Sequence, residues 1–261
     1  MRLFQPGKIG NVIVKNRIVM APMGIGALVE HDGRLTQKAI NYFVARAIGG
    51  VGMIITGSGR VTRRIEYSTR VPRHLAVDNT RYIPGLKALA ESAHRCGAKV
   101  AVQVRAGVGR VLYRTLLNKL EPVAPSAVPC FWDKRKNARE LTKEEIEALT
   151  KDFEMSARFL KEAGIDAIEI ESHSGYLMDQ FLTGLWNKRN DEYGGSLAGR
   201  IRHTIQVIEA IKKGSDEKLP VIFRFGLSHF LEDGRNIDEG LEIAKRLERA
   251  GVDAFHIDAG C

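Results

Sequence analysis

The chain has 261 residues, of which 44% are hydrophobic, so it can bury a substantial core within a single globular domain. Its formal net charge is +9, but basic and acidic residues are interleaved along the chain, which argues against nucleic acid as a partner. The three cysteines, Cys96, Cys130 and Cys261, form no close pair, so their spacing predicts neither a metal site nor a disulfide framework.

The N-terminal segment has no apolar signal region, and no later stretch has the uninterrupted apolar length that a membrane span needs. We therefore expect a cytoplasmic protein without membrane contact. The segment from Leu3 to Val14 contains turn signals at Pro6-Gly7 and Gly10-Asn11. These signals predict a hairpin that could close the bottom of a barrel.

Short apolar runs alternate with amphipathic helical stretches along the rest of the chain. The runs that we predict to be strands are Ile18–Met20, Val51–Thr56, Val100–Val104, Ala167–Ile170, Val221–Arg224 and Ala254–Ile257. The helices carry N-cap signals at Thr36, Thr142, Ser196 and Asn236, and Thr142 forms a capping box with Glu145. This rhythm predicts repeated βα units and a parallel sheet.

The number of predicted strands leaves two architectures open. A closed (β/α)8 barrel needs about eight strands, and this chain ends just after the last of the runs named above. The chain is therefore either an open α/β sheet or the first part of a barrel that continues beyond residue 261. In both cases, a site is expected at the carboxyl ends of the strands.

The connection between the strand Ala167–Ile170 and the helix starting at Ser196 is long, polar and rich in aromatic residues. Its landmarks are Gly175-Tyr176-Leu177, Gln180-Phe181-Leu182, Asn187, Arg189 and Asp191-Glu192-Tyr193-Gly194-Gly195-Ser196. This order and spacing resemble the signature loop of the old yellow enzyme family of flavin-dependent ene-reductases, and the resemblance runs in register along the chain. It implies that residues 1–261 are an FMN-binding (β/α)8 TIM-barrel domain with about six βα units, a hairpin and an incomplete C-terminal end.

The resemblance also implies where FMN lies. The candidate cofactor residues are Ala21, Pro22, Met23, Gly24, Gly57, Ser58, Gln103 and Arg224. In the family, the backbone after the first strand follows the flavin edge. Gln103 can donate to and accept from the pyrimidine part of the ring, and Arg224 can stabilise the charge of reduced flavin near N1. Taken singly, each residue also has a structural interpretation as a turn glycine, a polar barrel residue or an ion-pair partner.

Tyr176 is the candidate proton donor. In the family, the tyrosine of the Gly-Tyr-Leu phrase protonates the carbon α to a carbonyl, while hydride from the flavin reaches the β carbon. The alternative is an aromatic residue that packs at the start of the loop. Most family members place a His-x-x-His or His-x-x-Asn pair before the Gly-Tyr, but here these positions are Glu171 and Ser174.

Glu171 is the second candidate catalytic residue. Burial beside a flavin raises the pKa of a carboxyl group unless a cation such as Arg105 or Arg224 pairs with it. A protonated Glu171 could donate to a substrate oxygen or relay a proton with Tyr176, whereas an ionised one would be the structural partner of an arginine. We predict a role in the site, and the sequence leaves the protonation state open. The candidate substrate contacts are Arg105, His173 and Ser174, although His173, on an extended segment, is expected to point elsewhere.

The missing histidine pair argues against simple enone reduction and favours the branch of the family with 2,4-dienoyl-CoA reductases and enoate reductases. The implied function is NAD(P)H-dependent, FMN-mediated reduction of a small-molecule α,β-unsaturated or aromatic acyl-CoA or enoate, in a protein that could be a homo-oligomer. That branch also carries an iron–sulfur cluster and an FAD-binding half, which only a longer protein could contain.

Two other classes stay open. One is a barrel lyase or aldolase with a phosphorylated ligand, which the basic residues between positions 105 and 139 would suit. However, no lysine ends a strand where a Schiff base would form, and this argues against it. The other class is a flavin-free, non-catalytic scaffold.

Overall fold

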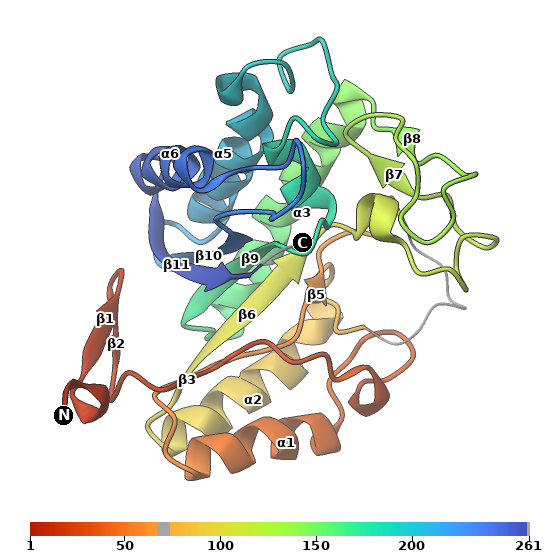
Figure 1. Ribbon diagram of the computed structural model, residues 1–261. Coiled ribbons are helices and arrows are strands. Elements are labelled where there is room, and N and C mark those ends of the chain that lie inside the picture. Colours follow the sequence, from red (N-terminus) through yellow and green to blue (C-terminus); the bar gives the residue numbers. More distant parts are fainter. Residues whose placement is uncertain (67–73, 260–261) are drawn as a thin grey trace.

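The computed structural model describes residues 1–66 and 74–259. Its centre is a parallel sheet of seven strands in the order β11-β10-β9-β6-β4-β3, with the short β5 paired to β6. The strands are β3 (Val19–Met20), β4 (Met53–Ile55), β5 (Gly59–Arg60), β6 (Lys99–Arg105), β9 (Ala167–Ser172), β10 (Val221–Gly226) and β11 (Val252–Asp258). The sheet curls and the helices lie outside it, as in part of a (β/α)8 barrel, which confirms the predicted fold class (Figure 1).

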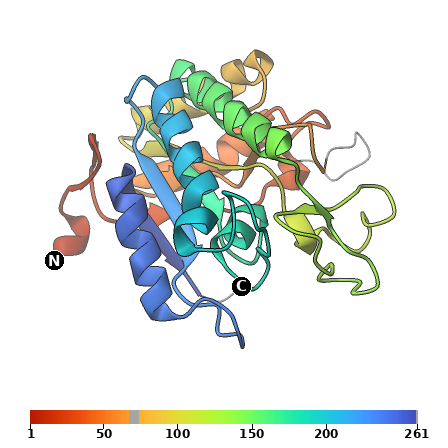
Figure 2. The same cartoon turned by 90° about the horizontal axis from the view of Figure 1, so that it is seen from above.

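Within the described residues, six α-helices connect or flank the strands. They are α1 (Gln37–Ile48), α2 (Ile83–Arg95), α3 (Lys143–Glu162), α4 (Leu177–Leu182), α5 (Leu197–Gly214) and α6 (Ile237–Arg249). The shorter elements are the 3-10 helices η1 (Arg2–Phe4), η2 (Gly26–Leu28), η3 (Thr80–Tyr82) and η4 (Gly109–Val111), and the paired strands β7 (Val123–Ala124) and β8 (Arg139–Glu140). Seen from above, α3, α5 and α6 follow one another around the outside (Figure 2).

The predicted helix starts are confirmed by the capping contacts. The side chains of Thr36, Ser196 and Asn236 each accept a hydrogen bond from a backbone N–H in the first turn of α1, α5 and α6. Thr142 and Glu145 form the reciprocal capping box of α3. The sequence did not predict α4, which lies inside the long connection after β9.

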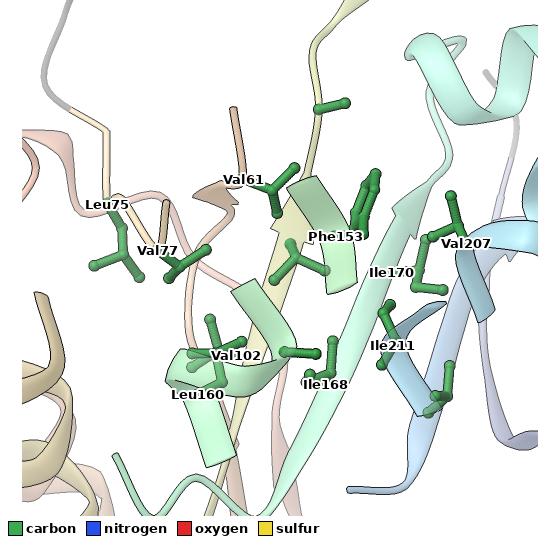
Figure 3. Close-up of a cluster of buried hydrophobic side chains, with 14 of the residues drawn as sticks. Val61, Leu75, Val77, Val102, Phe153, Leu160, Ile168, Ile170, Val207 and Ile211 are labelled. Atoms are coloured by element: carbon green, nitrogen blue, oxygen red, sulfur yellow. The ribbon is translucent and has the colours of Figure 1, made fainter. Parts of the chain in front are cut away.

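Side chains along the strands point alternately to the outer and the inner face of the sheet, and both faces are buried. On the outer face, Val102 and Ile168 pack with Leu160 of α3, and Ile170 lies near Val207 of α5 (Figure 3). On the inner face, the side chains are apolar near the amino ends of the strands and polar near the carboxyl ends. The apolar ones are Met53, Ile55, Ala101, Ala167 and Ile222, and the polar ones include Gln103, Arg105, Glu169, Glu171 and Arg224.

The predicted hairpin consists of β1 (Gly7–Ile9) and β2 (Val12–Val14), which pair antiparallel. Ile9, Val12 and Val14 pack on the apolar part of the inner face. Nδ2 of Asn11 in the turn donates to the carbonyl oxygen of Lys218, just before β10, at 3.1 Å. The hairpin therefore covers the amino-terminal end of the half-barrel, as predicted, and the opposite end is left for a site.

Two further features concern the cysteines and the length of the helices. Cys96 and Cys130 are free thiols, and Cys130 is buried. Cys261 lies outside the described residues. Across 1–66 and 74–259, every helix falls short of the combination of length and apolar character that would carry it through a bilayer.

Candidate active site

The polar end of the inner face opens into a cavity of about 670 Å³ at the carboxyl ends of the strands. This volume is in the usual range for small-molecule and cofactor sites. The predicted residues that line it are Pro22, Gly24, Gly57, Ser58, Gln103, Arg105, Glu171, His173, Tyr176 and Arg224. Tertiary structure thus brings together residues that are far apart in the sequence, on β6, β9, β10 and the connections after β3, β4 and β9.

The segments that follow β3 and β4 meet backbone to backbone at the cavity wall. A Cβ atom on Gly57 would lie 2.2 Å from the carbonyl oxygen of Met23, so only glycine fits there. Gly24, in contrast, faces open space, with nothing within 4 Å of the position of a Cβ. Ala21 lines a smaller neighbouring cavity of about 220 Å³, and the side chain of Met23 is 53% exposed. Only some of the predicted segment after the first strand therefore lines the main cavity.

Gln103 is held by a buried acid that the sequence analysis missed. Its Nε2 donates to Oε1 of Glu169 at 2.8 Å, and Oε2 of Glu169 lies 2.8 Å from Nδ1 of His256. This bond uses one of the two N–H donors of the amide, so the carbonyl oxygen and the second N–H of Gln103 are left for a ligand. The signal for Glu169 was its position as the one charged residue within the apolar run Ala167–Ile170.

Arg224 carries a buried donor without an acceptor. Its Nη2 donates to Oδ2 of Asp258 at 2.7 Å, whereas its Nε is buried and has no hydrogen-bond partner among the described residues. A buried donor of this kind is normally satisfied by protein, water or ligand. Because Arg224 lines the cavity, a bound ligand with an acceptor atom would supply the missing partner.

Glu171 lies at the centre of the polar wall. Its Oε2 accepts from Oγ of Ser58 at 3.1 Å and lies 3.6 Å from Nη1 of Arg105, and its Oε1 lies 3.8 Å from Nε2 of His173. Burial opposes ionisation, but Arg105, His173 and Ser58 outweigh it and lower the pKa of Glu171 below its usual value. The structure therefore favours the ionised, arginine-paired form, which the sequence leaves open, and the catalytic role stays a prediction.

The expectation that His173 points elsewhere is wrong. Positions 169, 171 and 173 share the inner face because β9 stays extended as far as Ser172, so His173 lines the cavity beside Glu171. Its Nδ1 lies 2.9 Å from Oδ2 of Asp258. Ser174, with a φ of 55°, turns the chain, and its hydroxyl contacts Nδ1 of His173 at 2.7 Å instead of lining the cavity.

Tyr176 is half-buried at the cavity wall, immediately before α4. Its ring meets that of His173 edge to face, with 5.6 Å between the ring centroids. Burial, together with Tyr113 and the charge of Glu171, raises the pKa of Tyr176 to about 12. The phenol therefore keeps its proton at neutral pH, as a proton donor must.

Comparison with known proteins identifies the family. A sequence profile of the NADH:flavin oxidoreductase / NADH oxidase family matches residues 2–260. The chain belongs to this family. It is 41% identical over 258 residues to an NADH oxidase of Thermoanaerobacter brockii, which covers 99% of this chain and 39% of that protein. It is 39% identical over 274 residues to a cinnamate reductase of Clostridium sporogenes, covering 99% of this chain and 41% of that protein. The chain thus spans about two fifths of the length of these relatives.

Solved structures agree with this assignment. A complex of 2-naphthoyl-CoA reductase with 2-naphthoyl-CoA superposes with a TM-score of 0.88 at 30% identity, over 99% of this chain and 40% of that one. An old yellow enzyme homologue of Zymomonas mobilis superposes with a TM-score of 0.84 at 26% identity, over 100% of this chain and 74% of that one. The resemblance found in the signature loop is therefore confirmed, and so is the barrel fold.

Membership of the NADH:flavin oxidoreductase family implies FMN as the cofactor, with NADH or NADPH as reductant. The cavity residues fit this group. The backbone at Gly24 is open to a flat ring, Gln103 presents a carbonyl oxygen, and Arg224 has an unsatisfied buried Nε. The lyase or aldolase and scaffold hypotheses have no such support.

Seven further cavity residues escaped the sequence analysis because they lie in irregular connections without periodicity. They are Ile25, Gly26, His74, Leu75, Tyr113, Thr115 and Leu116. Nδ1 of His74 lies 3.2 Å from Nη2 of Arg105, and burial together with Arg105 and Arg60 lowers the pKa of His74 to about 4. His74 is therefore a neutral imidazole at physiological pH, placed next to the cation that also contacts Glu171.

The basic connection between positions 105 and 139 only partly supports an anion site. Arg110 donates to the carbonyl oxygen of Pro129 at 3.0 Å, and Lys136 donates to that of Leu117 at 3.2 Å. These two cations thus hold the connection itself together. Arg114, in contrast, is exposed between two residues that line the cavity.

Proposed function

We propose that the full-length protein is an FMN-dependent reductase of an aromatic or α,β-unsaturated acyl-CoA thioester, with NAD(P)H as reductant. The observation that carries the proposal is the meeting of Tyr176, Arg105 and Glu171 in one cavity with Gln103 and Arg224. A structural neighbour named 2-naphthoyl-CoA reductase supports an aromatic acyl-CoA thioester, and a relative named cinnamate reductase supports an α,β-unsaturated substrate. The cytoplasmic location and the domain boundaries stay predictions.

FMN would be held by the backbone at Gly24 and Gly57, by the amide of Gln103 and by Arg224. When bound, it supplies the hydride for the β carbon of the substrate. The cavity wall supplies what the flavin does not: a proton, a fixed positive charge near the substrate carbonyl and exclusion of water.

Tyr176 holds its proton on Oη and would deliver it to the carbon α to the carbonyl. Arg105 would stabilise the negative charge that develops on the carbonyl oxygen, because its guanidinium is fixed between Glu171 and His74. This arrangement would replace the histidine pair that most members of the family place before the Gly-Tyr. An ionised Glu171 cannot donate to that oxygen, but it can orient the group that does.

The charges of the cavity favour a thioester over a free acid. Each cation at the cavity wall has its own carboxylate, since Arg105 pairs with Glu171 and Arg224 pairs with Asp258. A free carboxylate would therefore be repelled by Glu171 and would find no unpaired cation among the described residues of the cavity wall to offset the repulsion. A thioester carbonyl carries no charge and avoids this cost. The exposed Arg114, which stands between the cavity residues Tyr113 and Thr115 in the sequence, would suit the phosphates of coenzyme A.

The decisive experiment compares cinnamoyl-CoA with cinnamate in the purified full-length protein by stopped-flow absorbance of its flavin. Parent enzyme should oxidise its reduced flavin faster with the thioester. Tyr176→Phe should still bind flavin and accept hydride from NAD(P)H, but it should react with the thioester on the order of 100- to 10,000-fold more slowly. Protein without flavin absorbance, or an unchanged oxidative half-reaction in Tyr176→Phe, would contradict the proposed function.

A further inference from the structure

Directly behind Tyr176 lies a buried charged cluster that does not line the cavity. It consists of Asp179 on α4 and of His229 and Arg235 in the connection between β10 and α6, each at most 2% exposed. Oδ1 of Asp179 accepts from Nη2 of Arg235 at 2.9 Å and lies 3.3 Å from Nε2 of His229. We refer to these three residues as the Asp179 cluster.

The Asp179 cluster holds the backbone that carries Tyr176. Oδ2 of Asp179 accepts from the N–H of Gly175 at 3.0 Å, and Nε2 of Gln180 donates to the carbonyl oxygen of Gly175 at 2.6 Å. Both polar backbone groups of Gly175 are thus engaged. Gly175 adopts a φ of 67°, and a Cβ there would lie 3.1 Å from the ring of Trp186, so the turn into Tyr176 has little freedom.

The same cluster is anchored to the strand that carries Arg224. Nε and Nη2 of Arg235 donate to the carbonyl oxygen of Gly226, the last residue of β10, at 3.1 and 2.6 Å. Arg224 lies two residues earlier on the same strand. A continuous set of buried hydrogen bonds therefore connects the expected proton donor to the strand of the expected flavin contact.

Stability alone does not explain this arrangement. A buried ion pair often stabilises a fold no better than well-packed apolar residues would. Here Nη1 of Arg235 is also buried without a hydrogen-bond partner among the described residues, which adds a cost. The three residues do not line the cavity themselves, and their bonds end on the backbone next to Tyr176, which suits a role in orientation.

We propose that Asp179, held by Arg235, is a positioning residue that fixes Gly175 and thereby aims the phenol of Tyr176 at the substrate. This inference rests on the proposed function, in which Tyr176 donates the proton. It predicts that Asp179 affects turnover only through Tyr176. A displacement of about 1 Å at a reacting group can slow a reaction on the order of 100-fold.

The test uses flavin-loaded, full-length enzyme with Asp179→Ala, the conservative Asp179→Asn and a matched control, Asp191→Ala. Asp191 also pairs with a buried arginine of the same connection, Arg189 at 2.6 Å, but its other side-chain contact is the amide of Tyr193. Two quantities are measured for each variant. One is the rate of the oxidative half-reaction, alone and combined with Tyr176→Phe, and the other is hydrogen exchange at the amide of Gly175.

Asp179→Ala should slow the oxidative half-reaction on the order of 10- to 100-fold, leave reduction by NAD(P)H unchanged and speed exchange at Gly175. Asp179→Asn, which keeps an acceptor for that amide, should recover part of the rate. In the Tyr176→Phe background, neither substitution should slow the reaction further. If Asp179→Ala does not fold, Asp179→Asn and its double variant with Tyr176→Phe provide the same comparison.

Three results would overturn the inference. They are an equal loss of rate in Asp191→Ala, a full additional loss in the Tyr176→Phe background, and unchanged exchange at Gly175 in Asp179→Ala. Failure of the proposed function looks different, because Tyr176→Phe alone would then leave the oxidative half-reaction unchanged. In that case the positioning role also falls, even if exchange at Gly175 responds to Asp179→Ala.

Discussion

Replacement of Glu171 by Gln tests how the charge of the cavity selects its substrate. Glutamine keeps the shape of the side chain and an acceptor for Ser58, but it removes the negative charge that lies 3.6 Å from Arg105. Arg105 then loses its carboxylate partner, while Arg224 keeps its pair with Asp258. We therefore expect Glu171→Gln to shift specificity from the thioester towards the free acid.

The distance between Arg105 and Glu171 sets the scale of this effect. Two unit charges 3.6 Å apart interact by about 4 to 5 kcal/mol at an effective dielectric constant of about 20. In parent enzyme, a substrate carboxylate near Arg105 is repelled by Glu171 with an energy of similar size, and Glu171→Gln removes this repulsion. Relaxation of the protein and water in the cavity make the net gain in binding free energy smaller than this. We expect a gain of about 1.5 to 3 kcal/mol for cinnamate relative to cinnamoyl-CoA, or about 10- to 150-fold in the ratio of kcat/KM.

The assay measures kcat/KM for both substrates in parent enzyme and in Glu171→Gln, with retained flavin absorbance as the control for a folded site. A ratio that changes by less than about threefold would refute the argument from cavity charge. An increased preference for the thioester would refute it outright.

The pH dependence of unfolding gives a second check on Glu171. Because its pKa is lowered in the folded state, the ionised carboxylate stabilises the fold above the pKa of the unfolded chain, near 4.5. This contribution is lost as the pH falls through the lower folded pKa, and it is missing in Glu171→Gln at every pH. Urea unfolding should therefore separate the two proteins at pH 7 and bring them closer at pH 4.

Three further substitutions test the cofactor wall and the core. Gly57→Ala should release flavin, because its Cβ would lie 2.2 Å from the carbonyl oxygen of Met23. Flavin is measured by absorbance after gel filtration. Retention of stoichiometric flavin would show that the segments after β3 and β4 can move apart. Arg224→Met should weaken flavin binding by about 10-fold or more because it removes a charged donor, and an unchanged Kd would place Arg224 in a purely structural pair with Asp258. Phe153 lies in the interface of α3 with the sheet, and Phe153→Ala should lower the free energy of unfolding by about 3 to 5 kcal/mol without changing the flavin spectrum. A loss of less than about 1 kcal/mol in a urea titration would contradict its place in the core.

Local patterns were sufficient to predict the framework of the site. The N-caps at Thr36, Ser196 and Asn236 depend on contacts within one helical turn, so neighbouring residues alone specify them. Alternation along β6 and β9 similarly assigns Gln103 and Glu171 to the inner face, because strand side chains alternate whatever surrounds the strand. The irregular signature loop identified the family, since chance and periodicity rarely produce so long a pattern.

Tertiary structure decided what these side chains do. The ionisation of Glu171 depends on Arg105 from a neighbouring strand, and the neutral imidazole of His74 comes from a distant connection. Likewise, Asp179 acquires its partner Arg235 from a segment 56 residues later in the chain. A pKa and a buried hydrogen bond depend on distances between elements, and those distances follow from how the helices and the hairpin pack on the curled sheet. Sequence spacing does not contain that information, so many residues that line the cavity could be named from the sequence, whereas their charge states and mutual positions could not.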